Sequence, residues 1–558
     1  MVAVMKSALI CLALIGLLLQ GNPSSIGSIS GRVLDADTNT PLVGVRVDAR
    51  DRSAGATATT DSQGRYVFEK LPPGNRSIEV YDGNLGPSMT PSQTVTVVGG
   101  RDTQVDFHTR LFAEVSGRVL DDDGNPIAGM QVTANFKEYE GYSGRDGQPS
   151  RTGEVQLVSR RASGLTDDQG RYVITTLSAG LQYWIVASSP KRYAIPISDA
   201  PADPQARKRT LAATYYPSSD SIDTASALIL HSQEVRDGVD IRIHKAESYC
   251  LEATLTERGV PARMQFLLLE TAVSSTRLPS INLPGSFESA RDGKIRLCDL
   301  YPGRFHLIAA RLSSAAQESI AAVDVTITNK DVRDLVVAAI PPSTVSAELV
   351  WDKPPVEAAS PSIRVRTYPS PVGVNPSLTL PVPGTFSLSV VAGSSYITAI
   401  SGLDSHSYVK DVTYDGSSIL HQPFVPHGGD AKLRITIGSD AGSITATVLA
   451  ANGQLAAGSA VLIVPVSART EPDVAAAFLA GITNENGIYS VGGLPPGKYD
   501  VFAANNLPPT RVDRDGMLLI TRTPDAIGRI LRTRARGKQV EVGSGGAASV
   551  SLTPIRMD

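Results

Sequence analysis

One histidine and one glutamate stand at the spacing that zinc peptidases use, His231 and Glu234 in the segment HSQE. Catalytic zinc takes three protein ligands and keeps one position for water, so such a centre also needs a distant third histidine. The segment instead lies between ALIL and VRDGVDIRI, two stretches typical of strands joined by a turn, with no α/β catalytic domain around it. Because a four-residue pattern with two free positions recurs by chance, we interpret HSQE as a turn.

His421 and His427, in LHQPFVPHGG, are a second pair close enough in sequence to share a metal. They lie in an expected loop with no carboxylate or thiolate nearby, and such histidines are usually unbound. The chain contains no GxSxG, HExxH, Walker or CxxC motif. We therefore predict that the protein is not an enzyme and has no catalytic residue, metal or cofactor.

Aspartates cluster in short turns such as DDDG at 121–124 and TDDQG at 166–170. A calcium loop needs about six or seven oxygen ligands and a distal glutamate in register, and that glutamate is missing. Aspartate and asparagine also bond their own backbone in turns, and a following glycine accepts a positive φ. Turn formation alone explains these residues.

The second of these turns, TDDQG, belongs to a segment that occurs four times. Each copy has such a turn, then a strand of alternating apolar and polar residues, then a Pro/Gly corner from which a second strand leaves. The repeated object is a β-hairpin corner. Its copies are TDSQGRYVFEKLPPG (60–74), TDDQGRYVITTLSAG (166–180), ARDGKIRLCDLYPG (290–303) and TNENGIYSVGGLPPG (483–497).

Each corner follows a repeated opening strand. Twelve residues separate Gly117 from Gly129, and the same spacing separates Ala446 from Gly458, which indicates duplication. The opening strands are ISGRVL (29–34), VSGRVL (115–120), YCLEATL (249–255) and ITATVL (444–449).

The repeats predict an all-β chain, a tandem array of about five small β-sandwich modules. A long polar insertion at 136–161 in the second module is expected to form an exposed hairpin or loop. One short helix is expected near the C-terminus, at 523–538, with Thr523 as N-cap and Pro524 at its first position, and the final strand at 547–552. The predicted modules are 27–111, 113–246, 247–341, 342–440 (diverged) and 441–558.

Charge and the N-terminus narrow the class of protein. Lys and Arg total 52 against 55 for Asp and Glu, a balance that argues against nucleic acid as a partner. Residues 1–21 contain Lys6 and an apolar run too short for a membrane span, as in a secretory signal peptide. We expect an exported protein, in the periplasm, at the cell surface or extracellular, with no transmembrane span in the mature chain.

The repeated motifs resemble the carboxypeptidase regulatory-like domain. Its pattern is a strand with SG-x-V, a turn with G-x-P, a strand near T-D-x-x-G-x-Y, and L-P-P-G-x-Y beyond. The match is close in the first, second and fifth modules, partial in the third and faint in the fourth. The resemblance implies a small seven-stranded sandwich similar to transthyretin, and it confers no peptidase activity.

The resemblance also bears on Cys250 and Cys298. In a transthyretin-like arrangement the opening strand and the corner strand are neighbours in one sheet. Cys250 aligns with Ser30 on the outward face of the first, and Cys298 aligns with Glu69 on the outward face of the second. A cross-strand disulfide is therefore expected in a compartment that permits it.

Carbohydrate binding is an alternative function, because the family's sandwich is similar to starch-binding modules. Of the two tryptophans, Trp184 stands where other modules carry apolar core residues. The glycan-binding candidates are therefore Trp351, in ELVWDKPP, and Tyr139 and Tyr142 on the long insertion.

We predict a non-catalytic exported or cell-envelope protein that acts in adhesion, as a scaffold or as a spacer. Its partner is an unidentified envelope protein or polysaccharide. The alternatives are a carbohydrate-binding protein that uses exposed aromatic residues and an auxiliary module array for a separately encoded enzyme.

Overall fold

The computed structural model contains mainly β-strands, arranged in several small sheets. Within the residues described, no helix is long and apolar enough to cross a membrane. The described part of the chain is residues 26–557 without 37, 51–54, 82–91, 144–148, 161–164, 190–208, 271–286, 313–316, 341, 354–361, 369–376, 380–383, 392–394, 421–423, 427–430, 506, 509 and 513–517. The predicted signal peptide, residues 1–21, lies outside it.

The strands pair in five consecutive stretches of the described chain, which we call the first to fifth β domains. The first has two sheets, ordered β4-β1-β7 with β8 beside β1, and β3-β2-β5-β6. Its strands are β1 (Gly27–Asp35), β2 (Arg46–Arg50), β3 (Gly55–Thr59), β4 (Arg65–Leu71), β5 (Gly74–Tyr81), β6 (Ser92–Val97), β7 (Asp102–Gln104) and β8 (Phe107–Thr109).

The second domain repeats this plan and extends it. One sheet is β12-β9-β17 with β18, and the other is β11-β10-β13-β15 with β16. Its strands are β9 (Phe112–Leu120), β10 (Gln131–Ser143), β11 (Pro149–Arg160), β12 (Arg171–Ser178), β13 (Gln182–Ser188), β14 (Arg209–Leu211), β15 (Thr214–Tyr215), β16 (Leu228–Ile229), β17 (Val235–Arg236), β18 (Ile241–Arg242) and β19 (Lys245–Glu247).

The third and fourth domains follow. The third has sheets β21-β20-β24 with β27, and β23-β22-β25-β26; the fourth has β31-β28-β35-β33-β34 and β30-β29-β32. Their strands are β20 (Tyr249–Glu257), β21 (Val260–Pro261), β22 (Gln265–Glu270), β23 (Phe287–Glu288), β24 (Lys294–Leu300), β25 (Gly303–Leu312), β26 (Gln317–Ile327), β27 (Val332–Ala339), β28 (Pro342–Trp351), β29 (Ser362–Tyr368), β30 (Ser377–Thr379), β31 (Gly384–Val391), β32 (Ser395–Ser401), β33 (Tyr408–Tyr414), β34 (Ser417–Ser418) and β35 (Lys432–Gly438).

The fifth domain has sheets β39-β36-β44 and β38-β37-β40-β43 with β45, and it carries two helices. The elements are β36 (Gly442–Val448), β37 (Ala460–Pro465), α2 (Glu471–Ala477), β38 (Leu479–Ile482), β39 (Ile488–Leu494), β40 (Gly497–Asn505), β41 (Thr510–Val512), β42 (Leu518–Ile520), α3 (Pro524–Thr533), the 3-10 turn η2 (Arg534–Arg536), β43 (Lys538–Val542), β44 (Ala547–Leu552) and β45 (Ile555–Arg556).

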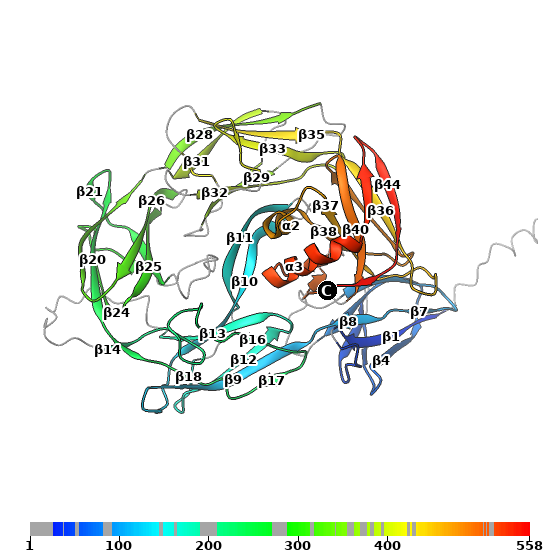
Figure 1. Ribbon diagram of the computed structural model, residues 1–558, viewed down its shortest axis with the longest axis horizontal. Helices are drawn as coiled ribbons and strands as arrows, with labels where there is room; N and C mark the ends of the chain where they lie inside the picture. Colours follow the sequence, from blue (N-terminus) through cyan, green and yellow to red (C-terminus); the bar gives the residue numbers. More distant parts are fainter. Residues whose placement is uncertain are drawn as a thin grey trace, which may run out of the picture.

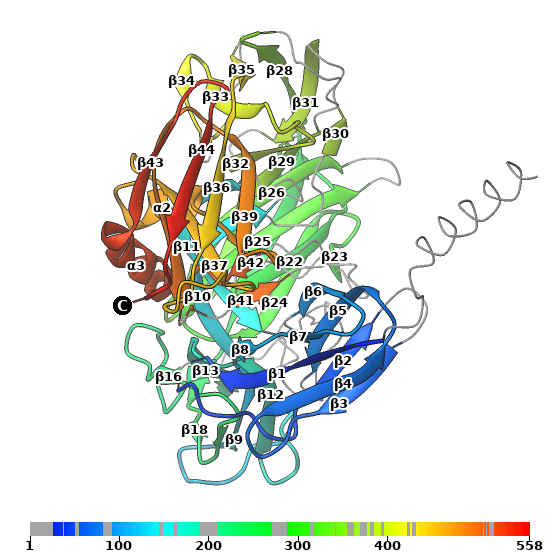
Figure 2. The same ribbon diagram turned by 90° about the vertical axis from the view of Figure 1, so that its right-hand side faces the viewer.

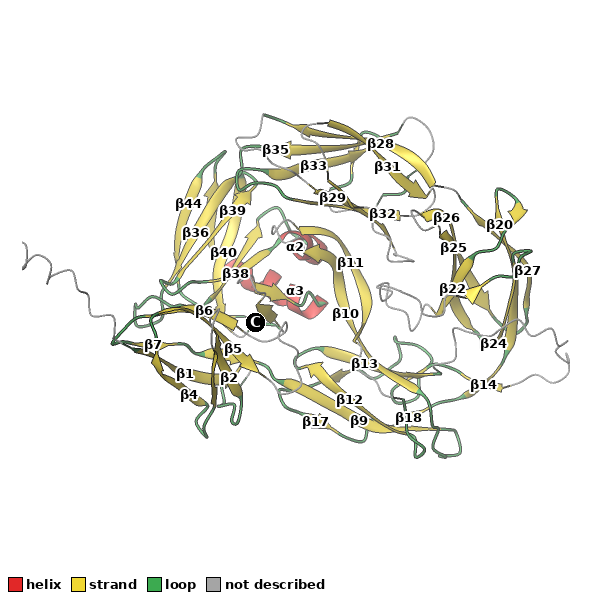
Figure 3. Cartoon of the chain, turned by 180° about the vertical axis from the view of Figure 1, so that it is seen from behind, coloured by secondary structure: helices red, strands yellow, loops and turns green. Residues whose placement is uncertain are grey.

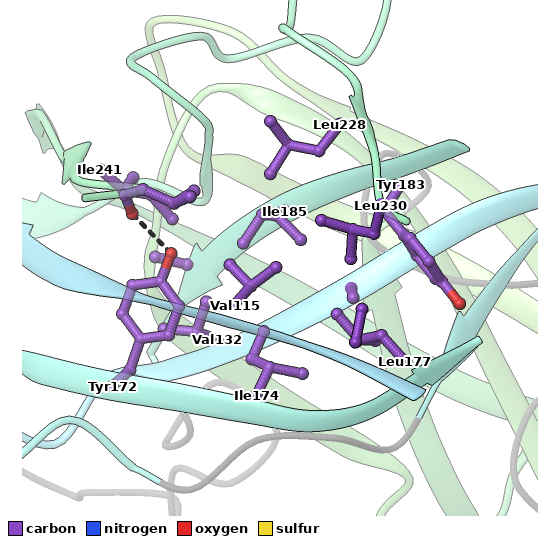
Figure 4. Close-up of a cluster of buried hydrophobic side chains, with 14 of the residues drawn as sticks. Val115, Val132, Tyr172, Ile174, Leu177, Tyr183, Ile185, Leu228, Leu230 and Ile241 are labelled. Atoms are coloured by element: carbon purple, nitrogen blue, oxygen red, sulfur yellow. Dashed lines mark hydrogen bonds between the residues drawn. The ribbon is translucent and has the colours of Figure 1, made fainter. Parts of the chain in front are cut away.

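Buried side chains from both sheets form each domain's core. In the second domain, Val115 and Ile174 from one sheet pack with Val132 and Ile185 from the other (Figure 4). All four are fully buried, because alternate residues of a strand point to one face of the sheet. The alternation expected for the opening and corner strands is confirmed.

The corner turns form as expected. In the first domain Asp61 Oδ1 accepts hydrogen bonds from the backbone N–H groups of Gln63 and Arg65, at 2.8 and 2.9 Å. Gly64 has φ of 70° and lies against the backbone of Val33, where a side chain would collide. These local bonds account for the aspartates of the turn.

The helix prediction was right in place and wrong in number. Helix α3 and η2 fill the predicted segment, and Thr523 caps α3 by accepting from Ala526 N at 3.1 Å. Helix α2 was not predicted. The strand at 547–552 is confirmed as β44, although β45 follows it.

The domains follow one another around a ring, and the fifth returns to the first (Figure 1). An added Cβ at Gly458 of the fifth domain would lie 3.0 Å from Oε1 of Gln93 in the first. The hairpin β10–β11 leaves its own domain and runs to α2 and α3 (Figures 1 and 3).

Candidate functional site

Three elements that interrupt the repeat meet one another. The hairpin β10–β11 is the long insertion of the second domain, α2 joins β37 to β38, and α3 lies between β42 and β43 of the fifth. Strand β11 packs along α2 and also contacts β32 of the fourth domain. We call the contact of the hairpin with α2 and α3 the hairpin junction.

Tyr139 of β10 is the centre of the hairpin junction. Its side chain is 6% exposed and packs in one apolar cluster with Val474, Phe478 and Ile527 of the fifth domain. The pairing of β10 with β11 shifts register between Tyr139 and Gly141, so the strand is irregular at this point. A β-bulge re-aims side chains in this way.

Two hydrogen bonds fix Tyr139 in place. Its backbone N–H donates to Arg522 O at 2.8 Å, and its hydroxyl donates to Glu471 Oε2 at 2.9 Å. Burial, together with the bond to Glu471, raises the pKa of Tyr139 to about 12. The hydroxyl is therefore a proton donor throughout the physiological pH range.

The fifth domain holds its side of the hairpin junction rigidly. Thr470 and Asp473 form a capping box at the start of α2, with each side chain bonded to the other's backbone N–H. Arg522 donates to the carbonyls of Ala475 and Phe478 at the end of α2, so one residue serves both the helix and Tyr139.

The two helices approach closely at a glycine. A Cβ at Gly528 of α3 would lie 3.1 Å from Oε1 of Glu471, the residue that binds the Tyr139 hydroxyl. The arrangement can hold the second and fifth domains together.

Two of the three aromatic candidates, Tyr139 and Trp351, are buried and not exposed as predicted. Tyr139 is buried in the hairpin junction, and Trp351 is 9% exposed within the apolar core of the fourth domain. Trp351 ends β28, where it continues the inward side of the alternation through Ala347 and Leu349. Tyr142 lies in β10, and its side chain is outside the described part. A stacking platform needs an open ring face, which neither Tyr139 nor Trp351 offers.

Cys250 and Cys298 are bonded in a disulfide that joins β20 to β24 within one sheet. Their Cα atoms are 4.0 Å apart. The register pairs Leu251 with Leu297, as Ile29 pairs with Phe68 in the first domain. Cys250 is thus equivalent to Ser28, whereas the sequence alignment had matched it with Ser30. Because the two positions differ by two residues, Cys250 still lies on the predicted side of the sheet.

The segment HSQE is a turn. Glu234 Oε2 accepts from His231 N at 2.8 Å, and Glu234 Oε1 accepts from Arg236 Nε at 2.6 Å. The bond from the His231 N–H, aided by Arg236, lowers the pKa of Glu234, although burial opposes this. The same turn contacts Leu111, at the boundary of the first two domains. The Leu111 N–H donates to Ser232 Oγ at 2.9 Å.

The remaining metal candidates give no site. His421 and His427 lie outside the described residues. Among the residues that are described, no three His, Cys, Asp or Glu side chains gather as metal ligands would.

Helix α2 had a signal in the sequence. The segment TEPDVAAAF has Thr470 followed three residues later by Asp473, with Pro472 in the first turn, which is the pattern of a capped helix. The docking of β10 had no such local signal, because its partners lie more than three hundred residues away along the chain, at a separation of 332 for Tyr139 and Glu471.

Comparison with known proteins identifies one domain. Residues 28–110 match the carboxypeptidase regulatory-like domain. The first β domain is of this family. No curated protein matches the chain.

Solved structures show weak similarity. The full-length major pilin RrgB from Streptococcus pneumoniae is 8% identical with a TM-score of 0.21, over 95% of this chain and all (100%) of that one. The Bacillus anthracis TIE protein is 14% identical with a TM-score of 0.17, over 56% of this chain and 51% of that one, so the chain spans about half of its length. A putative carbohydrate binding protein from Pseudomonas aeruginosa is 17% identical with a TM-score of 0.12, over 16% of this chain and 90% of that one.

Proposed function

We propose that the protein is an exported, non-catalytic scaffold of the cell envelope. In this proposal five transthyretin-like modules of seven strands, with the boundaries 27–111, 113–246, 247–341, 342–440 and 441–558, present surfaces for adhesion or assembly. The disulfide between Cys250 and Cys298 supports export, because such bonds persist in oxidising compartments.

The hairpin junction is the observation that carries the proposal. A string of domains joined only by linkers changes shape freely. Here Tyr139 of the second domain is buried among residues of the fifth, and this contact joins the two domains across the interior of the ring. Insertions that form contacts between domains of the same chain hold the molecule in a fixed shape, and a scaffold requires a fixed shape.

The test compares shape and envelope binding in the same variants. Tyr139→Ala removes the side chain at the hairpin junction, and Tyr139→Phe keeps the ring while removing the bond to Glu471. We expect Tyr139→Ala to increase the radius of gyration in small-angle scattering and to weaken retention of the mature chain on the producing cell's envelope fraction. Tyr139→Phe should change both much less.

Two results would overturn the proposal. One is a wild-type chain that the envelope fraction does not retain. The other is retention that stays the same when scattering shows the Tyr139→Ala variant to be expanded, because the fixed shape would then have no role in binding.

A further inference from the structure

The outer face of β2 in the first domain carries a charged cluster. Arg46, Asp48 and Arg50 point to this face, while Val47 and Ala49 between them are buried in the core. Strands β2, β3 and β5 lie at the periphery of the molecule, away from the hairpin junction (Figure 2).

Asp48 lies beneath the two arginines. Its side chain is 4% exposed, against 55% for Arg46 and 44% for Arg50. Asp48 accepts from Arg46 Nε and Nη2 at 2.8 and 2.9 Å, from Arg50 Nη2 at 2.9 Å, and from Thr57 Oγ1 at 2.9 Å. Burial alone would raise the pKa of Asp48, but these hydrogen bonds lower it below its ordinary value. An ionised, buried carboxylate thus orients two exposed guanidinium groups.

Tyr81 of β5 completes the cluster. The guanidinium carbons of Arg46 and Arg50 each lie 5.2 Å from the centre of its ring, within cation–π range. Arg50 Nη2 also donates to the Tyr81 hydroxyl at 2.8 Å. Neither arginine is a mobile surface cation, because each is held by a carboxylate and by an aromatic ring.

The donors of these arginines are only partly used. A guanidinium has five N–H groups in a fixed fork that matches a carboxylate. The bonds recorded for Arg46 in the described structure use Nε and Nη2, both toward Asp48. Arg46 therefore has donors on Nη1 with no recorded bond, on a side chain that is more than half exposed.

The surroundings favour a sugar over an acidic peptide. Glu79 lies beside the arginines, with its Oε2 3.9 Å from Arg50 Nε and 3.3 Å from the Tyr81 hydroxyl. A second anionic group of a ligand would be repelled there, whereas a hydroxyl would donate to the Glu79 carboxylate. The ring of Tyr81 adds an apolar surface next to these polar groups.

We propose that Arg46, Arg50 and Tyr81, oriented by Asp48, bind the sugar carboxylate of an acidic polysaccharide. The arginines take the carboxylate, Glu79 accepts from a sugar hydroxyl, and Tyr81 contacts the sugar ring. The inference goes beyond the scaffold proposal and does not require the closed ring, so the two fail independently.

The test uses the mature full-length chain and four polymers: polygalacturonate, neutral dextran, dextran sulfate and poly-glutamate. We expect binding to polygalacturonate that weakens with salt, and weaker binding to the other three. Arg50→Gln should weaken it by about tenfold or more, since the variant loses a charge-assisted hydrogen bond to the ligand. The control is Arg65→Gln, an exposed arginine of β4 in the opposite sheet, which should bind as the wild type does.

A second variant separates binding from folding. Arg50→Lys keeps a positive charge above Asp48 but loses the planar fork, so the domain should stay folded while affinity falls. The proposal is overturned if polygalacturonate does not bind, if Arg50→Lys and Arg50→Gln bind as well as the wild type, or if dextran binds equally. Tighter binding of poly-glutamate would assign the cluster to an acidic protein, and tighter binding of dextran sulfate to a sulfated polymer.

Discussion

The second and third β domains secure the same pair of strands in different ways. In the second, Tyr172 of β12 reaches across Gly117 of β9, and its hydroxyl donates to Val239 O at 2.6 Å (Figure 4). In the third, Ala253 and Ile295 stand at the two equivalent positions. The disulfide between Cys250 and Cys298, three residues away along each strand, joins this pair of strands instead.

The strand on the other side of the opening strand differs as well. In the second domain the parallel partner of β9 is broken into β17 and β18, and Val239 lies in the break. Asp240 then accepts from Arg118 N at 2.9 Å, in place of a backbone acceptor. In the third domain the partner of β20 is the single strand β27, although their register shifts between Leu251 and Ala253.

The first domain has the same tyrosine bond, aspartate acceptor and close glycine contact as the second. Tyr66 donates to Val105 O at 2.6 Å, and Asp106 accepts from Arg32 N at 2.8 Å. Gly31 lies so close to Val105 that an added Cβ would overlap its carbonyl. The glycine, the tyrosine hydroxyl bond and the broken strand thus occur together in the first two domains, whereas the fifth domain has Tyr489 opposite Ala446 beside the unbroken β44.

The largest expected effect comes from removing the disulfide of the third domain. Replacing Cys250 and Cys298 by serine frees a loop with a sequence separation of 48. The chain-entropy model gives at most about 4 kcal/mol of lost stability for a loop of this size. Hydrogen exchange of the intact chain should show faster opening of β20 and β24, with β9 and β12 unchanged. Equal acceleration in both domains would mean that the disulfide stabilises the ring and not its own sheet.

The next largest effect comes from a substitution at Gly117 of the second domain. Gly117→Ala places a Cβ against the carbonyl of Val239, and overpacking of this kind costs roughly 1–3 kcal/mol. The reverse change, Ala253→Gly, meets no such contact and should cost only about 0.5–1 kcal/mol through backbone entropy. Exchange rates on β9 and β20 measure the two. Similar costs would contradict the idea that only the broken strand requires glycine.

The smallest effect removes one hydroxyl. Tyr172→Phe keeps the ring and loses the bond to Val239, for an expected loss of about 1 kcal/mol. The control is Tyr489→Phe in the fifth domain, which occupies the equivalent position opposite Ala446 and has no hydroxyl bond recorded in the described structure. Exchange on β12 should quicken and exchange on β39 should not. An unchanged β12 would show that the hydroxyl bond adds no stability.

The sequence predicted what is decided by neighbours along the chain. The corner turns depend on an Asp or Asn and residues two and four positions later, and this information is contained in a short segment. The same holds for α3, with its cap at Thr523. The disulfide followed from the family's strand order, and a two-residue error in alignment left Cys250 on the correct side because strand side chains alternate.

Contacts between domains were beyond the sequence. The polar composition of 136–161 indicated an exposed hairpin, and its hairpin is confirmed, but Tyr139 is covered by residues of the fifth domain. Trp351 is a different case. The alternation through Ala347 and Leu349 already placed it in the core, and the polar segment DKPP after it was the wrong guide.

The order in which the chain is synthesised also matters for the hairpin junction. Tyr139 and Glu471 are separated by 332 residues, so synthesis at ~5–20 residues per second places tens of seconds between them. During that interval Tyr139 has none of the fifth-domain residues that bury it. A polypeptide stopped before α2 would therefore leave Tyr139 uncovered, and such transiently exposed apolar surface favours aggregation.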